Sequence, residues 1–444
     1  MSCQPCAPFI LFLALVASRA PADDWPHWLG PERDGSWNET GILREFPEDG
    51  PEVLWSAEVG AGYSGPAVAG GKVYLTDFVV EEGEVVNNPG KAIALRGTER
   101  ILCYDLDSGE RIWKHEDARR YELSYPGGPR CTPTVAGGRV YVLGGMGDLT
   151  CLDAASGDLV WRKNLPETFG SEIPIWGFSA HPLVHDGLVY TMGGGGDGVV
   201  VALDAETGET RWTAVEAPQP GYCPPILIEH AGTEQLIVWS PLGLNSLDPE
   251  TGAVHWSKPL KPNFNMAVTA PRKSGNRLFA SGIGRIGALY ELEDDKPGAR
   301  ILWKGKPKTA VYCSNSTPVI VGDTIYGVDI DTSQLMAVSM EDGRRLWGTT
   351  GPVMEATTGN DRHGTAFLTR HVESGLFYLF NEAGELVIAR LTPDAFTELS
   401  RTRLLEPTNE AFGRAVVWSP PAFADRSILV RNDKQLVRVK LAAE

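Results

Sequence analysis

The sequence is poor in basic residues and lacks the short motifs that mark several common enzyme classes. Its 57 acidic residues outnumber 40 Lys and Arg, which gives a formal net charge of −17. Such a surface repels phosphate backbones, so we expect no nucleic-acid partner. There is no Gly-x-Ser-x-Gly elbow, no His-Glu-x-x-His and no phosphate-binding glycine loop before a helix. These absences exclude the signatures of α/β-hydrolases, zinc proteases and P-loop enzymes.

Long apolar runs are also rare, and the longest lies at the N-terminus. Residues 9–16 are wholly apolar, a stretch too short to span a bilayer but suited to the core of a signal peptide. Ala20 and Ala22 are small residues of the kind that precede a cleavage site. We therefore expect residues 1–22 to be a signal peptide. The mature protein is then expected to be a soluble monomer without a transmembrane segment, in the periplasm or outside the cell.

Cysteine is scarce outside this presequence. Five cysteines remain there, at Cys103, Cys131, Cys151, Cys223 and Cys313, and an odd number cannot pair completely. Cys103 and Cys151 each stand six residues before a glycine of a repeated turn. We interpret the cysteines as small buried strand residues. Their spacing matches no zinc or haem motif, so we assign no metal ligands.

Glycine and tryptophan, by contrast, are abundant, with 50 and 13 copies, and they recur at spacings of about 44 to 51 residues. The most regular copy covers residues 132–161. In it a short apolar run ends at Gly-Gly, a β-branched and aromatic run follows, and a third run enters a Ser-Gly turn. A fourth run ends at Trp161. Such a pattern predicts four antiparallel strands joined by hairpins, which is one propeller blade.

The tryptophan of the fourth run keeps its place from copy to copy, at Trp113, Trp161, Trp212, Trp256, Trp303 and Trp347. Isolated core residues would not keep this register. The pattern therefore predicts an aromatic ring wedged between neighbouring blades.

The two ends of the chain complement each other. The last copy, residues 420–441, contains three strand-like runs, and the missing fourth is found in residues 50–59, around Trp55. An N-terminal strand that completes the last blade would close the ring and remove two open sheet edges. We therefore predict an all-β fold: a single eight-bladed β-propeller of four-stranded antiparallel blades over residues 50–444, preceded by a lead-in segment, residues 23–49.

The pattern Asp-x-x-Ser/Thr-Gly-x-x-x-Trp, as in residues 153–161, resembles the repeat of the pyrroloquinoline-quinone (PQQ)-like β-propeller family. The resemblance covers nearly all of the expected mature chain, and residues 24–35 look like the lead-in of exported planctomycete members. It implies the propeller fold. Because the family includes quinoprotein dehydrogenases and non-catalytic assembly proteins of the BamB type, it leaves function open.

Candidate site residues lie on the face opposite the hairpins, where the irregular links run and where residues 79–100 form the longest insertion. Residues just before each innermost strand should ring the mouth of the central channel. The candidates for holding a ligand are Arg130, Trp176, His181, Tyr222, Asn315, Arg362, His363 and Trp418. Arginine can bind a carboxylate and the aromatic rings can stack on a flat ligand. Alternatively, these residues plug the channel and satisfy one another's hydrogen bonds.

Two functions remain open at this point. One is a binding scaffold that engages a protein or a small ligand through its loop face. The other is a PQQ-dependent oxidoreductase acting on an alcohol or a sugar, for which the resemblance implies PQQ and calcium. Calcium would need clustered oxygen ligands. The carboxylates on the loop face are Asp197, Asp329 and Asp331, although each also suits a turn. No catalytic residue is assigned.

Overall fold

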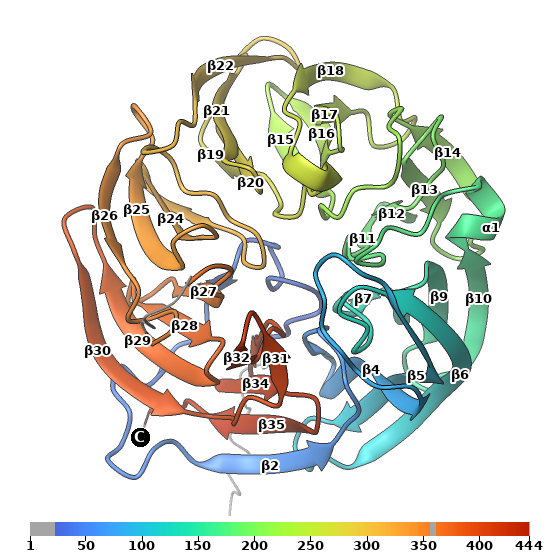
Figure 1. Ribbon diagram of the computed structural model, residues 1–444, viewed down its shortest axis with the longest axis vertical. Helices are drawn as coiled ribbons and strands as arrows, with labels where there is room; N and C mark the ends of the chain where they lie inside the picture. Colours follow the sequence, from blue (N-terminus) through green and yellow to red (C-terminus); the bar gives the residue numbers. More distant parts are fainter. Residues whose placement is uncertain (1–22, 356–360, 444) are drawn as a thin grey trace, which may run out of the picture.

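The fold is a ring of eight sheets around a central channel, each built on four antiparallel strands (Figure 1). One sheet has a short fifth strand, β1 (Ser36–Trp37), which pairs in parallel. The computed structural model describes residues 23–355 and 361–443. The expected signal peptide, residues 1–22, lies outside the described residues. Each sheet is one blade, and we number the blades in chain order. The all-β, eight-bladed architecture predicted from the repeat is confirmed.

The strands of each blade are given from the channel outward. Blade 1 contains β3 (Ala67–Ala69), β4 (Lys72–Glu82), β5 (Ile93–Asp105) and β6 (Arg111–Leu123), and blade 2 contains β7 (Thr134–Ala136), β8 (Arg139–Leu143), β9 (Asp148–Asp153) and β10 (Leu159–Asn164). Blade 3 contains β11 (Leu183–His185), β12 (Leu188–Met192), β13 (Val200–Asp204) and β14 (Thr210–Ala214), and blade 4 contains β15 (Ile226–His230), β16 (Thr233–Trp239), β17 (Gly243–Leu247) and β18 (Val254–Pro259).

The second half of the ring follows the same order. Blade 5 contains β19 (Arg272–Ser274), β20 (Arg277–Gly282), β21 (Ile286–Leu292) and β22 (Ala299–Lys304), and blade 6 contains β23 (Val319–Val321), β24 (Thr324–Asp329), β25 (Gln334–Ser339) and β26 (Arg345–Thr349). Blade 7 contains β27 (Ala366–His371), β28 (Phe377–Asn381), β29 (Glu385–Leu391) and β30 (Phe396–Arg403). Blade 8 contains β33 (Ala422–Ala424), β34 (Ser427–Arg431), β35 (Gln435–Lys440) and β2 (Val53–Glu58).

The ring is closed by its N-terminal strand, as the sequence predicted. β2 pairs antiparallel with β35, with Ser56 opposite Val437. Figure 1 shows β2 in blue along the outer side of the red strands of blade 8. Because β2 and β35 come from opposite ends of the chain, their pairing closes the ring and leaves no open sheet edge at this joint.

All but one of the repeated tryptophans donate a hydrogen bond to the next blade. The Trp161 indole N–H of blade 2 donates to the carbonyl of Ala205 in blade 3 at 3.0 Å. A Cβ on Gly208 would lie 2.7 Å from the same ring. The turn also needs glycine because the φ of Gly208 is +71°. The same indole-to-carbonyl bond joins Trp55 to Leu106, Trp113 to Ala154, Trp212 to Pro249, Trp303 to Met340 and Trp347 to Thr392.

The predicted wedge between blades is therefore confirmed at these positions, with one departure. The Trp256 indole instead donates to the Gln235 side chain of its own blade, at 3.3 Å.

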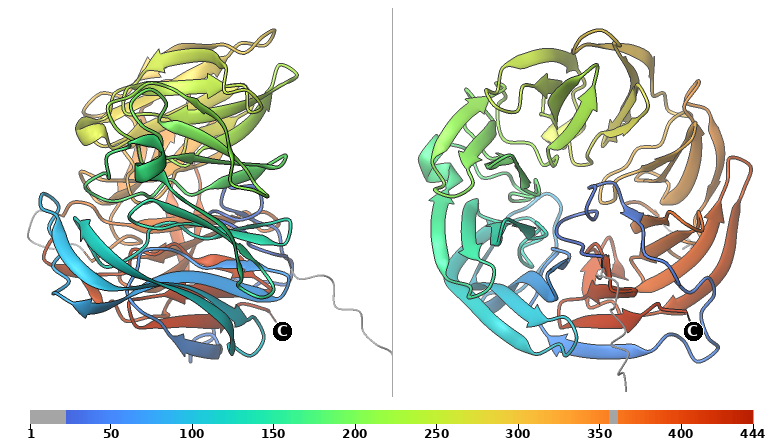
Figure 2. Two further views of the ribbon diagram at one scale, coloured as in Figure 1. Left: turned by 90° about the vertical axis from the view of Figure 1, so that its right-hand side faces the viewer. Right: turned by 180° about the vertical axis from the view of Figure 1, so that it is seen from behind.

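The lead-in segment crosses the hairpin end of the channel. Trp25 forms a β-bridge with Val68 of blade 1, and β1 (Ser36–Trp37) pairs in parallel with β27 of blade 7. In the right-hand view of Figure 2 the blue segment runs across the centre of the ring. The segment thus ties together blades on opposite sides of the closure and covers one end of the channel.

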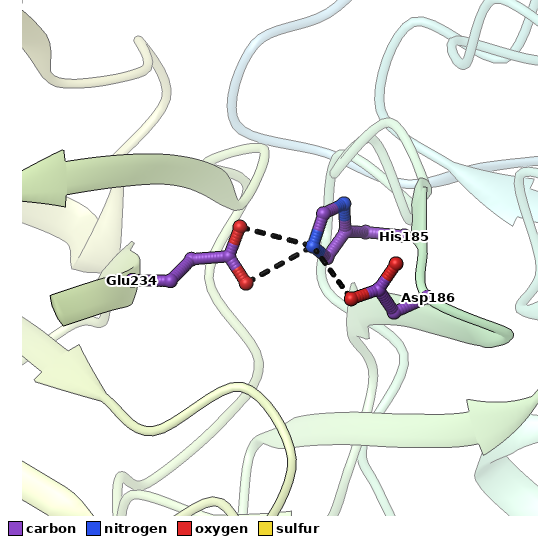
Figure 3. Close-up of side chains that lie close together, drawn as sticks. All are labelled: His185, Asp186 and Glu234. Carbon is purple, nitrogen blue, oxygen red and sulfur yellow. Dashed lines mark hydrogen bonds and ion pairs between the residues drawn. The ribbon is translucent and has the colours of Figure 1, made fainter.

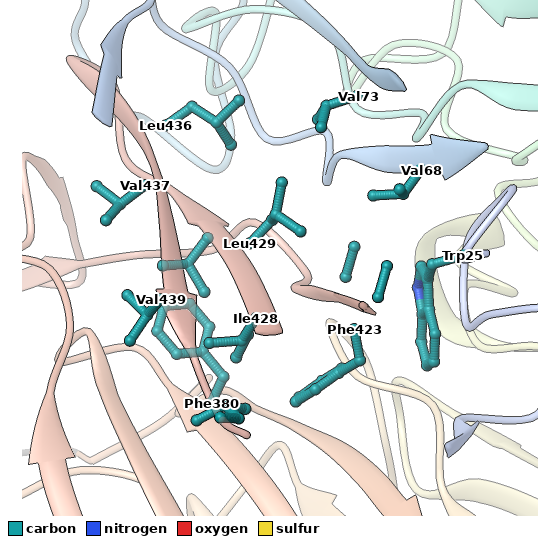
Figure 4. Close-up of a cluster of buried hydrophobic side chains, with 14 of the residues drawn as sticks. Trp25, Val68, Val73, Phe380, Phe423, Ile428, Leu429, Leu436, Val437 and Val439 are labelled. Carbon is teal, nitrogen blue, oxygen red and sulfur yellow. The ribbon is translucent and has the colours of Figure 1, made fainter. Parts of the chain in front are cut away.

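A hydrophobic cluster surrounds the joint between the first and last blades. Figure 4 shows Trp25 of the lead-in beside Phe423 of β33, whose ring centroid is 5.6 Å away, with Val68, Ile428 and Val439 around them. All five side chains are buried. The lead-in therefore contributes core residues to the propeller as well as a strand.

The remaining elements are minor. α1 (Leu165–Phe169) and the 3₁₀ turn η1 (Asn263–Asn265) lie between strands, and β31 (Asn409–Ala411) and β32 (Arg414–Val416) form a two-stranded hairpin between blades 7 and 8. Among the described residues, no helix is long and apolar enough to cross a membrane.

The five cysteines outside the expected presequence are all buried and free, which confirms their interpretation as core residues. Burial raises the pKa of Cys103, Cys151 and Cys223 to about 12. These thiols are therefore protonated and unreactive at neutral pH.

Candidate ligand-binding cavity

The channel end opposite the hairpins opens into a cavity of about 990 Å³. All eight residues selected from the sequence line this one cavity: Arg130, Trp176, His181, Tyr222, Asn315, Arg362, His363 and Trp418. They precede the innermost strands of blades 2, 3, 4, 6, 7 and 8. The repeat brings them together because every blade starts at the same end of the channel. Their role in binding a ligand remains a prediction.

The lead-in segment supplies the far end of the cavity. Trp28 lines the cavity and stacks on His181, with ring centroids 4.8 Å apart and planes 9° from parallel. Behind it, the Arg33 guanidinium donates to the carbonyl of Pro182 at 3.0 Å and lies 5.8 Å from the Trp28 ring centroid. The channel is therefore closed from the hairpin side by the N-terminal segment and open on the loop side.

One wall is a continuous group of aromatic rings. His363 and Phe412 stack with centroids 4.3 Å apart and planes 1° from parallel. Phe412 lies 6.2 Å from Trp418, which lies 5.7 Å from Tyr125. Phe412 is 43% exposed. This wall offers flat apolar surface to a ligand.

The facing wall carries a buried hydroxyl group with no partner. The Tyr222 ring meets Trp176 edge-on, at 5.9 Å between centroids. Tyr222 is 2% exposed, and its hydroxyl makes no hydrogen bond to any described residue. An unpaired buried hydroxyl costs about 1–3 kcal/mol.

Arg130 has a structural role in addition to its place in the wall. Its guanidinium donates to four backbone carbonyls: those of Ser124, Tyr125 and Trp176, at 2.9, 2.6 and 2.9 Å, and that of Gly128. It also lies 5.3 Å from the Tyr63 ring centroid. For this side chain the alternative of internal hydrogen bonding holds, and Arg130 organises the loops around it. It forms no ion pair with a described carboxylate, so its charge is not neutralised.

Arg362 differs from Arg130 because it is exposed at the cavity and makes no hydrogen bond or ion pair with a described residue. Its neighbour His363 is held in the left-handed region at φ +59°, and the His363 N–H donates to the Ile330 carbonyl at 2.9 Å. Burial, with Arg362 and Arg414 nearby, lowers the pKa of His363 to about 4. His363 is therefore neutral at neutral pH.

His181 is also neutral, and its tautomer is fixed. Its Nδ1 accepts the backbone N–H of Thr132 at 2.9 Å, so the proton of the neutral ring is on Nε2. Burial, followed by the charge of Arg33, lowers the pKa of His181 well below its usual value. The cavity charge at neutral pH thus comes from arginine.

The three carboxylates considered as calcium ligands do not gather at the cavity. Asp331 lines it but pairs with Arg285 at 2.8 Å. Asp329 is fully buried and pairs with Arg345 at 3.1 Å, while Asp197 is exposed in its turn. Calcium takes about six to eight oxygen ligands. The residues present therefore do not fit a calcium-bound quinone cofactor.

A separate polar cluster lies on the hairpin side. Figure 3 shows the imidazole of His185 between Glu234 and Asp186, with Nε2 at 3.0 Å and 3.4 Å from their carboxylate oxygens. In the part of the chain that the structure describes, it is the one group of three side chains close enough to share a metal ion. Because His185 ends β11 and Glu234 lies in β16, the cluster links blades 3 and 4 at the surface.

The sequence did not reveal every lining residue. Trp28 was part of the segment expected only to precede the propeller, and Phe412 lies in the hairpin between blades 7 and 8, outside the repeat. The 3₁₀ turn adds Phe264, which is 72% exposed. Phe264 and Phe412 could have been selected from the sequence, because each is an aromatic residue in a link between two blades.

The buried histidines predict a loss of stability in acid. Burial, followed by the charge of Arg33, lowers the pKa of His27 from 6.5 to about 3. Between these values the unfolded chain binds a proton that the folded protein does not, so stability falls as the pH drops, by up to about 1.4 kcal/mol per pH unit. Between pH 7 and pH 5, we expect the free energy of unfolding of His27→Gln to fall by up to about 2 kcal/mol less than that of the wild type.

Urea unfolding at pH 8, 7, 6 and 5 measures this difference. The two proteins should keep a constant stability difference from pH 8 to pH 7 and converge below pH 6.5. Parallel stability curves down to pH 5 would contradict the assignment of a neutral buried His27.

The amino-acid sequence of most of these blades matches a known protein family. The model of the family described as "Outer membrane protein assembly factor BamB" matches residues 97–349, more than half of the 444 residues. The chain belongs to this BamB family. The family assignment agrees with the PQQ-like repeat and with the observed propeller.

Individual relatives include an assembly factor and a dehydrogenase subunit. The outer membrane protein assembly factor BamB of Shewanella oneidensis is 24% identical over 230 residues, which cover 49% of this chain and 56% of that protein. The dehydrogenase subunit of the alcohol dehydrogenase (quinone) of Komagataeibacter europaeus is 27% identical over 181 residues, 37% of this chain and 24% of that protein. The chain thus matches about half of the first relative and a quarter of the second.

A solved structure extends the comparison of the fold. The quinohemoprotein alcohol dehydrogenase from Comamonas testosteroni superposes with a TM-score of 0.58 at 13% identity, covering 95% of this chain and 81% of that one. At this identity the likeness concerns the propeller alone.

Proposed function

We propose that the protein is a binding scaffold whose channel-mouth cavity takes a small, sugar-like ligand. The observation that carries this proposal is the convergence of aromatic rings and amide groups from several blades on one cavity that is closed at its far end. A volume of about 990 Å³ lies at the upper end of the range typical of ligand pockets, about 300–1,000 Å³.

The lining has the chemistry that a sugar needs. Aromatic faces such as those of Trp176 and Trp418 can stack on the apolar face of a sugar ring. Amides and hydroxyls can each both donate and accept hydrogen bonds, which suits ring hydroxyls. The residues that supply them are Asn263, Asn265, Asn315, Ser179, Thr269, Ser314 and Thr317.

We favour this scaffold over a PQQ-dependent oxidoreductase. A dehydrogenase of that class needs a carboxylate base and a set of oxygen ligands beside its cofactor. Among the described residues that line the cavity, the one carboxylate is Asp331, and Arg285 holds it at 2.8 Å. We expect calorimetric titration with PQQ and calcium to give no binding heat, and micromolar binding would restore the enzyme hypothesis.

We also propose that the protein is exported. The apolar run in residues 9–16 and the small residues before Asp23 support it, as does the similarity to the outer membrane protein assembly factor of Shewanella oneidensis. N-terminal sequencing of the protein made in its own host should find Asp23 first. An intact Met1 in the purified protein would contradict export by cleavage.

The ligand proposal is tested by calorimetry with neutral trisaccharides, namely cellotriose, maltotriose and chitotriose. We expect at least one of them to bind. Trp176→Leu should weaken that binding by about tenfold, because loss of a stacking surface costs about 1 kcal/mol or more. Trp347→Leu is the matched control, since Trp347 is also half-buried but bridges blades 6 and 7 away from the cavity.

Both variants are first checked for folding by thermal unfolding. Absence of binding by all three sugars, or an equal loss in the two variants, would contradict a sugar site at the cavity.

A further inference from the structure

The charge of the cavity is opposite to that of the protein as a whole. The chain carries a formal net charge of −17. Within the cavity, however, Arg130 and Arg362 have no carboxylate partner among the described residues, while the lining carboxylate Asp331 is neutralised by Arg285. The lining therefore has unbalanced positive charge.

Two arginines close behind the cavity lining are matched by a carboxylate. The pairs are Arg345 with Asp329 at 3.1 Å and Arg414 with Glu382 at 2.5 Å. Both Asp329 and Glu382 are almost completely buried. These two arginines are neutralised, whereas Arg130 and Arg362 in the cavity lining form no ion pair with a described carboxylate.

A third unmatched arginine lies behind the far end. Arg33 is 7% exposed and bonds to the carbonyls of Pro182 and His181, with no described carboxylate within ion-pair distance. Burial lowers its pKa only to about 10, so it keeps its charge at neutral pH. Its distance of 5.8 Å from the Trp28 ring centroid places this charge directly behind the cavity. In a partly desolvated site, such charges attract an anion more strongly than they would at the surface.

Building on the proposed function, we infer that the ligand is a sugar bearing a carboxylate, of the uronic acid class. Arg362 has its guanidinium donors free and can hold a carboxylate through two parallel hydrogen bonds. Arg130 adds charge, since most of its donors are committed to backbone carbonyls.

Calorimetry with two matched pairs of probes tests this inference: D-glucuronate against D-glucose, and D-galacturonate against D-galactose. Each acid differs from its neutral sugar by the carboxylate at the last carbon. At low salt we expect the acid of at least one pair to bind about tenfold more tightly, and this preference to shrink as salt rises. Arg362→Gln should remove the preference, because it lowers affinity for the acid more than affinity for the neutral sugar.

Arg211→Gln is the control, because Arg211 is exposed on β14, outside the cavity, and should leave the preference intact. Equal affinity for acid and neutral sugar, or a preference that survives Arg362→Gln, would overturn the inference alone. If neither member of either pair binds, and the neutral trisaccharides also fail, the proposed function falls together with it.

Discussion

Replacing Gly208 with alanine should lower the free energy of unfolding by about 2–5 kcal/mol, whereas Gly187→Ala should cost about 1–2 kcal/mol. Both glycines have left-handed backbones, with φ of +71° and +75°. A Cβ at Gly208 would lie 2.7 Å from the Trp161 ring, while at Gly187 it would meet nothing within 4 Å. The difference between the variants therefore isolates the contact between the glycine and the tryptophan.

Guanidinium chloride unfolding of the two variants measures this difference. Because Gly157 and Gly252 pack under Trp113 and Trp212 in the same way, their alanine variants should resemble Gly208→Ala. Equal destabilisation of Gly208→Ala and Gly187→Ala would show that the tryptophans do not fix the spacing of the blades.

Trp37→Ala should cost about 3–5 kcal/mol, as expected for a large aromatic side chain removed from a core. Trp37 is 1% exposed, and its ring lies 4.8 Å from Phe423 and 5.1 Å from Tyr378. Its indole N–H donates to the buried carboxylate of Glu39 at 2.8 Å, so the substitution also removes a hydrogen bond from Glu39. The lead-in segment is thus expected to stabilise the closed ring.

Leu54→Ala is the control for this prediction, because Leu54 belongs to the nearby strand β2 but is 39% exposed. It should change stability by no more than about 0.5 kcal/mol. If Trp37→Ala lowered the free energy of unfolding by less than about 1 kcal/mol, the lead-in would contribute little to the stability of the propeller.

The blades were predictable because their signals repeat. A recurring glycine turn and tryptophan gave the blade boundaries, although the seventh copy, residues 364–401, has no tryptophan. The missing strand in residues 420–441 identified β2 as its complement. The path of the lead-in does not repeat. Its contacts, such as Trp28 on His181, join residues far apart in sequence once only, so no pattern reveals them.

Residues 79–100 show a second limit. Their place outside the repeat identified them as an insertion on the loop face, but β4 runs on to Glu82 and β5 begins at Ile93. Strand pairing continues because alternate residues, such as Phe78 and Leu95, are buried against Tyr121. The insertion is therefore mainly sheet, and only its connecting link, with Pro89 and Gly90, reaches the cavity.

The candidate site was predictable in position but less so in detail. Propeller topology places the residue before each innermost strand at the channel, which is why the eight selected residues share one cavity. The difference between Arg130 and Arg362 depends on loop conformation, because the carbonyls that engage Arg130 converge only in the folded links. From the sequence alone, the two arginines cannot be distinguished.

The most direct test of the cavity as a binding site is NMR of the methionine methyl groups during titration with D-glucuronate. Met266 is the one methionine among the described lining residues, and Met340 is buried in blade 6 as an internal reference. Met266→Leu assigns the signal. We predict that the Met266 methyl resonance shifts with saturation while Met340 does not move. An unchanged Met266 resonance, or shifts of equal size at both methionines, would contradict binding at the channel mouth.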